Sequence, residues 1–377
     1  MIQSNTRYNW RLDLIRNHAK IGEARIKSMT INFVEDADIT RTMRATIPVD
    51  GFATNPYEIK VHKGIYFDGT LKFNGTWGFG GVDKWEYVDT EFSLFSDRIR
   101  PVVEIDGTES NYGDYVVIAA PTTYDGKEKV YDIEAYDEIM LVSQSSIPAR
   151  KYYAAGTPYL TIIQALLMEC GISKIYAEDN NLAITVDHEY ALGTSYLTII
   201  NELLDEIGYS HVYAGSNGYV FLHTNNTKST ADFTYTDKNS TITSEIKSNT
   251  DIYSLPNVIV GYVSNPDIST VLRVAKINDN PNSLISTVRR GYNVVQAYQF
   301  DDCPDVATLT RAVDQKFLEA TQATETAEIE TMPDGNHEYG SYINLGVDDD
   351  NSLFREIEWQ VTAGGTMSHK LERRVFV

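Results

Sequence analysis

A segment in the middle of this chain occurs twice, at a spacing of 37 residues. Residues 156–171 read GTPYLTIIQALLMECG, and residues 193–208 read GTSYLTIINELLDEIG. Self-similarity at a fixed period indicates one supersecondary unit that is used twice. No other pattern in the chain is as specific, and neither copy carries a catalytic group.

Each copy has the signals of an amphipathic helix. Thr157 and Thr194 are placed to cap the helices, Pro158 suits the first helical position, and Gly171 and Gly208 suit a left-handed residue at the end. The apolar positions form one stripe per helix, and these are Ile162, Ile163, Leu166, Leu167, Ile199, Ile200, Leu203 and Leu204. We expect both stripes to pack in a core.

The two copies predict one small helix–strand–helix–strand module. A short strand is expected after each helix, over residues 180–184 and 217–221. Two copies are too few for a solenoid, which usually needs three or more repeats. The repeat therefore predicts a compact domain over residues 149–228, which divides the chain into residues 1–148, 149–228 and 229–377.

Both flanking regions read mainly as strands. Before the repeat, alternating runs lie at 8–15, 25–33, 71–77, 85–95, 112–118 and 129–135, separated by turns at Asp68-Gly69, Asn74-Gly75, Asp106-Gly107 and Asp125-Gly126. After it, strands are expected at 256–263, 270–277, 287–300, 326–331, 341–345, 357–361 and 373–377. One helix is expected at 304–324, with Pro304 in its first turn. The fold class is α+β and mostly antiparallel β, with a barrel or sandwich over the first part.

The charge of the chain argues against nucleic acid as a specific ligand. The formal net charge is −21, and such an acidic surface repels phosphate and anionic lipid. The charge is still compatible with DNA that moves along an acidic inner surface without binding to it. No apolar run is long enough to span a membrane, and the N-terminus has no basic region before an apolar one. We expect a protein that is made in a cytoplasm, or that is released without a Sec-type signal.

Metal and phosphate motifs are weak. His211 and His223 lie next to apolar strand residues, without a cysteine or carboxylate at ligand spacing. The glycine-rich stretch Trp77–Gly81 lacks the spacing and the helix of a phosphate loop. The acidic run Asp348–Asn351 lacks the alternating ligands and the glutamate of a calcium loop. We therefore expect no metal and no cofactor.

Catalytic groups are not visible either. Cys170 and Cys303 are far apart and form no CxxC pattern. Carboxylate pairs such as Asp301-Asp302, or Glu356 with Glu358, are unspecific in a chain with 53 acidic residues. The sequence predicts no catalytic residues and no enzyme.

Several segments, taken in order, resemble the central hub proteins of phage tails and baseplates. That family includes tail-tip hubs, the N-terminal part of tail-associated proteins, and hubs of phage-tail-like bacteriocins. The segments that carry the resemblance are 8–14, 20–23, 39–42, 136–141, 194–204, Gly208-Tyr209, 217–219, 255–260, 286–291, the helix at 304–324, Trp359 and 367–370. They cover nearly the whole chain.

The resemblance implies two barrel-like tube domains per chain, which flank the duplicated module. It implies a homotrimer that forms a pseudo-sixfold ring, continues the tail tube, adapts it to a threefold spike or tip, and lets DNA pass. The implied partners are a tail tube or distal tail protein, a spike or tip protein, and the C-terminus of a tape-measure protein. The implied location is the virion, after assembly in the host cytoplasm, without membrane insertion by this chain. The last barrel strand is expected near Val377, with no lytic domain beyond it.

Two other functions stay open from the sequence. Tyrosine-rich strands with Trp77 and Trp85 are compatible with a carbohydrate- or receptor-binding β-protein. A peptidoglycan hydrolase is the third possibility, because such enzymes accompany tail proteins.

Overall fold

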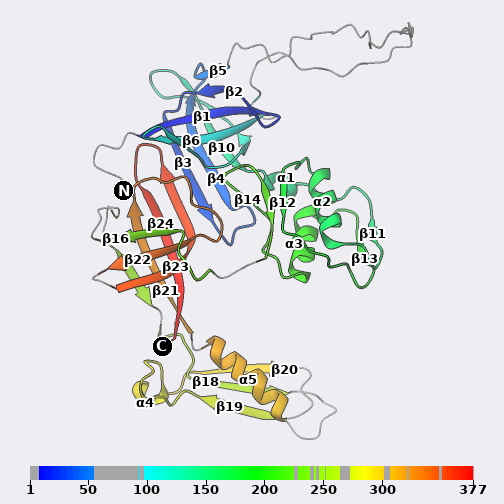
Figure 1. Cartoon of the computed structure of the whole chain (residues 1–377), viewed down its shortest axis with the longest axis vertical. Helices are drawn as coiled ribbons and strands as arrows, with labels where there is room; N and C mark the ends of the chain where they lie inside the picture. Colours follow the sequence, from blue (N-terminus) through cyan, green and yellow to red (C-terminus); the bar gives the residue numbers. More distant parts are fainter. Residues whose placement is uncertain are drawn as a thin grey trace.

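One large sheet organises the computed structural model (Figure 1). The structure describes residues 8–54, 93, 97–224, 228–237, 242, 246–250, 252–263, 272–300, 306–320, 322–347 and 350–376. The predicted strands at 71–77 and 85–95, apart from Ser93, lie outside these residues, as do the turns at 68–69 and 74–75. Within the described residues the fold is α+β with five helices and mostly antiparallel strands, which confirms the α+β and antiparallel part of the predicted fold class.

The large sheet has 16 strands. The strands from the first part of the chain are β1 (Tyr8–Arg16), β2 (Ala19–Ala24), β3 (Ser28–Val34), β4 (Arg41–Pro48), β5 (Phe52–Thr54), β6 (Arg98–Ile105), β7 (Thr108–Asn111), β8 (Tyr115–Ala119), β9 (Thr122–Tyr124) and β10 (Lys129–Asp137). Those from the last part are β16 (Phe233–Thr236), β17 (Lys247–Thr250), β21 (Gln322–Thr331), β22 (Tyr342–Val347), β23 (Asp350–Thr362) and β24 (Met367–Phe376). Their main order is β17-β21-β24-β23-β3-β4-β10-β8-β6-β1-β2-β5.

The first and last parts of the chain join through the pair β3–β23. The register runs from Glu358 opposite Val34 to Thr362 opposite Thr30. Trp359, from the last part, lies in the apolar core of the first part and stacks on Phe33 with ring centroids 5.6 Å apart. The two ends of the strand order, β5 and β17, do not pair with each other among the described strands.

The duplicated module lies beside this sheet (Figure 1). It contains α1 (Ile139–Gln144), β11 (Lys151–Tyr153), α2 (Tyr159–Glu169), β12 (Ile175–Ala177), β13 (His188–Tyr190), α3 (Tyr196–Glu206), β14 (Tyr213–Ala214) and β15 (Val220–Leu222). All eight residues of the two predicted stripes are at most 2% exposed, so the prediction of core packing is confirmed.

Three details of the module differ from the sequence expectation. The helices begin one residue later than expected, so the threonines do not cap them, and each donates its hydroxyl proton to a backbone carbonyl three residues back. The segment 180–184 forms only an isolated bridge at Ala183 instead of a strand. The strand that follows α2 is β12, which pairs in parallel with β15. Gly171 and Gly208 do end their helices with positive φ of 86° and 70°.

The two copies bind each other reciprocally. The amide of Ile147 donates to Thr194 O at 2.9 Å, and 37 residues later the amide of Ile184 donates to Thr157 O at 3.0 Å. Strands β11 and β13 pair around Tyr152 and Glu189, which are also 37 residues apart. The repeat is therefore a pseudo-twofold unit, in which the segment before each copy pairs with the start of the helix in the other.

A separate small sheet lies below the large one in Figure 1. Its strands are β18 (Val258–Val263), β19 (Arg273–Ile277) and β20 (Val295–Phe300), and α5 (Val306–Ala320) covers them with Leu309 and Val313. Helix α5 is the predicted helix at 304–324, with residues 304, 305 and 321 outside the described residues. Its predicted end is wrong, because residues 322–324 pair with β24 as the start of β21. The strand expected at 287–300 is wrong at its start, where α4 (Thr287–Arg290) forms because Ser286 caps it and Gly291 adopts φ 74°.

Candidate functional site: a polar junction and a buried histidine–glutamate group

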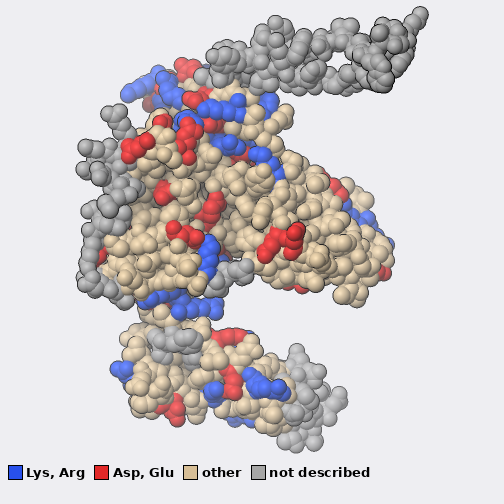
Figure 2. All heavy atoms as spheres, in the orientation of Figure 1, with Lys and Arg blue, Asp and Glu red and all other residues tan. Residues whose placement is uncertain are grey.

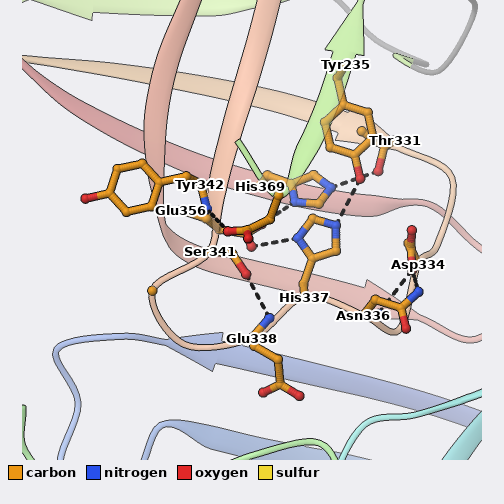
Figure 3. Close-up of polar contacts among 12 residues, drawn as sticks. Tyr235, Thr331, Asp334, Asn336, His337, Glu338, Ser341, Tyr342, Glu356 and His369 are labelled. Atoms are coloured by element: carbon orange, nitrogen blue, oxygen red, sulfur yellow. Dashed lines mark hydrogen bonds and ion pairs between the residues drawn. The ribbon is translucent and has the colours of Figure 1, made fainter. Parts of the chain in front are cut away.

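The loop between β21 and β22 connects three parts of the molecule. These are the strands from the first part of the chain, the duplicated module, and the large-sheet strands from the last part of the chain. The side chain of His337 points into the last part of the sheet, whereas the neighbouring Glu338 faces the other two parts (Figure 3). Glu338 binds Arg41 of β4 at 2.6 Å and accepts from the amide of Ser216 in the module at 2.9 Å. Tyr339 stacks on Tyr213 of the module, with ring centroids 4.2 Å apart. This junction loop, residues 332–341, therefore fixes the relative positions of the three parts.

Arg41 is the buried cation of the junction. Its side chain is 1% exposed and also donates to the backbone oxygens of Tyr112 and His337 at 3.3 and 3.4 Å. Burial lowers the pKa of its guanidinium, but Glu338, Tyr115 and Asp137 together outweigh burial and hold the pKa above its ordinary value. Arg41 is thus charged and held by groups from two distant segments.

Asp137 joins the sheet to the module. It accepts from the amide of Arg41 at 2.8 Å, the amide of Ile139 at 2.9 Å and the hydroxyl of Thr40 at 3.2 Å. Complete burial raises the pKa of Asp137 to about 6 against these donors. The side chain thereby anchors the start of α1 to the β3–β4 connection.

A second polar group is buried inside the last part of the sheet (Figure 3). Glu356 of β23 lies between two imidazoles, with Nδ1 of His337 at 2.7 Å and Nδ1 of His369, on β24, at 2.5 Å. The outer nitrogens contact hydroxyls, His337 Nε2 with Tyr235 at 2.9 Å and His369 Nε2 with Thr331 at 2.8 Å. The side chains of His337, Glu356 and His369 are all 0% exposed.

Burial and pairing act in opposite directions in this group. Burial raises the pKa of Glu356, but the two imidazoles outweigh it and bring the pKa to about 2. Burial lowers the pKa of His369 more than the glutamate raises it. Glu356 is therefore a buried carboxylate that depends on its two partners.

A different histidine–carboxylate group lies on the surface of the module. His188, Glu202 and Glu206 place their ligand atoms within 4.8 Å of one another, but both glutamates are exposed. In the first copy of the repeat, Lys151 occupies the position equivalent to His188 and binds Glu169 at 2.6 Å. The first copy thus has a lysine ammonium at the position where the second copy has an imidazole. Because an ammonium is not a metal ligand, this equivalence favours a surface ion pair over a metal site.

The histidines singled out in the sequence do not form a site. His211 is exposed and lies 3.3 Å from Asp205. His223 contacts the hydroxyl of Tyr213 at 2.6 Å and the backbone oxygen of Thr224 at 2.7 Å. Their ring nitrogens have separate partners. The stretch Trp77–Gly81 lies outside the described residues, as do Asp348 and Asp349, whereas Asp350 and Asn351 begin strand β23.

Among the described residues, the carboxylates and the cysteine singled out in the sequence do not combine into a catalytic group either. The strand register shifts between Glu356 and Glu358, so Glu356 faces the core and Glu358 faces solvent. Burial raises the pKa of the half-buried Cys170. Cys303 and Asp301-Asp302 lie outside the described residues.

Sequence reasoning missed the buried group because its members are spread over three segments. His369 alternates with Met367 and Leu371, which are both buried. A histidine at an inward position of an apolar strand was the available signal, but it does not identify a partner.

Two hollows of the surface are lined by described residues. One of about 550 Å³ opens over β21, β23 and β24, where Glu328, Glu330 and Glu358 lie beside Lys247 and Lys370. Figure 2 shows acidic and basic side chains interspersed over the visible face of the sheet and module. None of the described helices is both long and apolar enough to cross a membrane.

Comparison with known proteins identifies the fold. No protein-family model matches the chain. No curated protein matches it in sequence. The solved tail protein from Neisseria meningitidis superposes with a TM-score of 0.57 at 9% identity, over 97% of this chain and 96% of its own. The 43 kDa tail protein of prophage MuSo2 from Shewanella oneidensis gives 0.55 at 9% identity, over 97% and 98%.

A secretion-system structure shares the fold as well. The half-lidded PdpA–VgrG complex of Francisella gives a TM-score of 0.54 at 9% identity, over 99% of this chain and 58% of that one. The chain thus has the fold of phage tail proteins, and the resemblance seen in the sequence is confirmed at the level of fold.

Proposed function

We propose that this chain is a structural hub of a phage tail tip or baseplate, or of a tail-like injection machine. The observation that carries the proposal is the match of fold over nearly the full length of two tail proteins, 96% and 98% of their chains. The chain then acts by assembly instead of catalysis, at the tail of the virion after assembly in the host cytoplasm.

In this proposal three copies form a ring. We assign residues 1–148 and 229–377 to two regions on either side of the module at 149–228, and the pairing of β3 with β23 supports joining them through one sheet. Sheet edges such as β5 and β17 are hazards unless a neighbour pairs with them, and a closed ring supplies that neighbour. Two barrel-like tube domains per chain then give a pseudo-sixfold ring that joins the tail tube to a threefold spike.

The partners in the proposal are a tail tube or distal tail protein, a spike or tip protein, and the end of a tape-measure protein. The net charge of −21 suits a ring through which DNA passes without sticking. The carbohydrate-binding alternative depended on Trp77 and Trp85, which lie outside the described residues. The hydrolase alternative loses the pair Glu356 and Glu358, which lie on opposite faces of β23.

Electron microscopy tests this function directly. Purified full-length protein and tail particles are imaged, and antibodies against the exposed face of the module mark the chain. We expect a threefold ring coaxial with the tube. A chain that is absent from the tail, or that stays monomeric within its tip, contradicts the proposal.

A further inference from the structure

The direction of the hydrogen bonds around Glu356 is fixed by an acceptor at the far end of the network. The backbone oxygen of Met332 carries no proton, so the hydroxyl of Thr331 donates to it at 3.0 Å. A hydroxyl has one proton to give, and therefore Thr331 accepts from Nε2–H of His369 at 2.8 Å. The proton of His369 is thus placed on Nε2.

The second histidine has similar surroundings. Its outer nitrogen, Nε2, contacts the hydroxyl of Tyr235 at 2.9 Å, and its inner nitrogen, Nδ1, contacts Glu356 at 2.7 Å. Both rings therefore turn Nδ1 toward Glu356 and Nε2 toward a hydroxyl (Figure 3).

With its proton on Nε2, a neutral His369 would face the Glu356 carboxylate with the lone pair of Nδ1, at 2.5 Å. Two acceptors at this distance repel unless a cation lies between them. The ligand atoms of His337, Glu356 and His369 lie close together in a site where all three side chains are 0% exposed. A single metal ion there would engage all three side chains.

We propose that His337, Glu356 and His369 bind one divalent transition metal ion, with zinc as the preferred ion. Two imidazole nitrogens and one carboxylate oxygen are a common zinc ligand set, and their ligand atoms lie within 4.8 Å of one another. The hydroxyls of Tyr235 and Thr331 contact the outer nitrogens and orient the rings, as outer partners of metal-binding histidines do. For their ligand atoms to lie about 2.0–2.1 Å from a zinc ion, the imidazole rings and the carboxylate need to move apart by less than about 1 Å.

The ion has a structural role in this inference, which does not depend on the proposed tail function. It ties the junction loop, through His337, to β23 and β24, and the next residue of the loop binds Arg41 and Ser216. Metal binding therefore stabilises the contacts that join the first part of the large sheet, its last part and the duplicated module.

Zinc titration of the full chain tests the site. Protein dialysed against a chelator and then against buffer is titrated with Zn²⁺ by calorimetry, and its melting temperature is followed. We expect one tightly bound zinc ion per chain and a rise in Tm. Glu356→Gln should lose tight binding, whereas Glu358→Gln on the exposed face should retain it. His188→Gln should also retain it, because the surface group is not the site.

Cobalt gives a second readout that needs no folded variant. Co²⁺ bound to wild type should show the intense visible bands of a four-coordinate ion with nitrogen and oxygen ligands, and zinc should displace it. Wild type that binds no zinc, or cobalt spectra typical of a fully hydrated ion, overturns the proposal. Tight binding that survives Glu356→Gln but disappears in His188→Gln overturns it too.

Discussion

The duplicated module and the junction loop are held together by opposite kinds of contact. The module packs one continuous cluster of buried apolar side chains, contributed by both copies of the repeat. The junction loop is held by charged and polar groups such as Glu338, Arg41 and Ser216, which come from distant segments. An apolar core tolerates little change of polarity, whereas a polar junction depends on the identity of each partner. Substitutions can test this difference.

The largest effect is expected in the module. Leu203→Asp places an unpaired carboxylate at a fully buried position of α3, and we expect a loss of about 4–5 kcal/mol in the free energy of unfolding. Urea denaturation followed by circular dichroism measures it. Leu192→Asp is the matched control, because Leu192 is 70% exposed. A Leu203→Asp protein that unfolds like wild type would show that this helix face is not core.

This contrast also separates what the sequence can predict from what it cannot. The repeat spacing and the apolar stripe predicted α2, α3 and their packing, because periodicity is local information. The contact of Arg41 with Glu338 joins residues 297 positions apart and leaves no periodic trace. The bulge near Glu356 likewise reverses which residues of β23 face inward, and an alternation pattern cannot place it.

The next effect is expected at the junction. Arg41→Met removes a buried guanidinium that donates to Glu338 and to two backbone oxygens, so each of these acceptors loses a hydrogen bond. We expect a loss of about 3 kcal/mol, reduced from the usual cost because the side chain of Glu338 is 38% exposed. Chemical denaturation of both variants measures it, with Arg44→Met as the control since Arg44 is 78% exposed. Equal effects of the two variants would contradict a polar junction.

A smaller effect concerns the carboxylate between sheet and module. Burial raises the pKa of Asp137 to about 6, above the ordinary value of 3.8. Between these values the native state holds a proton that the unfolded state has released, so its stabilising contribution falls as pH rises from about 4 to 6. The change is about 2–3 kcal/mol at 1.36 kcal/mol for each pKa unit.

Asp137→Asn tests this dependence, because an amide does not titrate. The difference in unfolding free energy between wild type and Asp137→Asn should be largest near pH 4 and decrease toward pH 6. Carboxyl chemical shifts in a nuclear magnetic resonance titration give the pKa independently. A difference between the two proteins that is constant with pH would mean that Asp137 is charged throughout.

The smallest effect tests whether the pseudo-twofold relation of the module extends to its side chains. The hydroxyl of Tyr159 donates to Glu206 at 2.6 Å, and the hydroxyl of Tyr196 donates to Glu169 at 2.7 Å. Each glutamate raises the pKa of the tyrosine that it binds to about 12, so both hydroxyls stay protonated donors at neutral pH.

Tyr159→Phe and Tyr196→Phe should therefore each cost about 1 kcal/mol, the net contribution of one hydrogen bond. Tyr196→Phe should cost slightly less, because Glu169 keeps the ammonium of Lys151 at 2.6 Å, whereas Glu206 keeps only His188 at 3.6 Å. Parallel urea denaturation of the two variants measures the difference. If one variant costs several times as much as the other, the two copies share only their backbone arrangement, and the side-chain contacts between them are not equivalent.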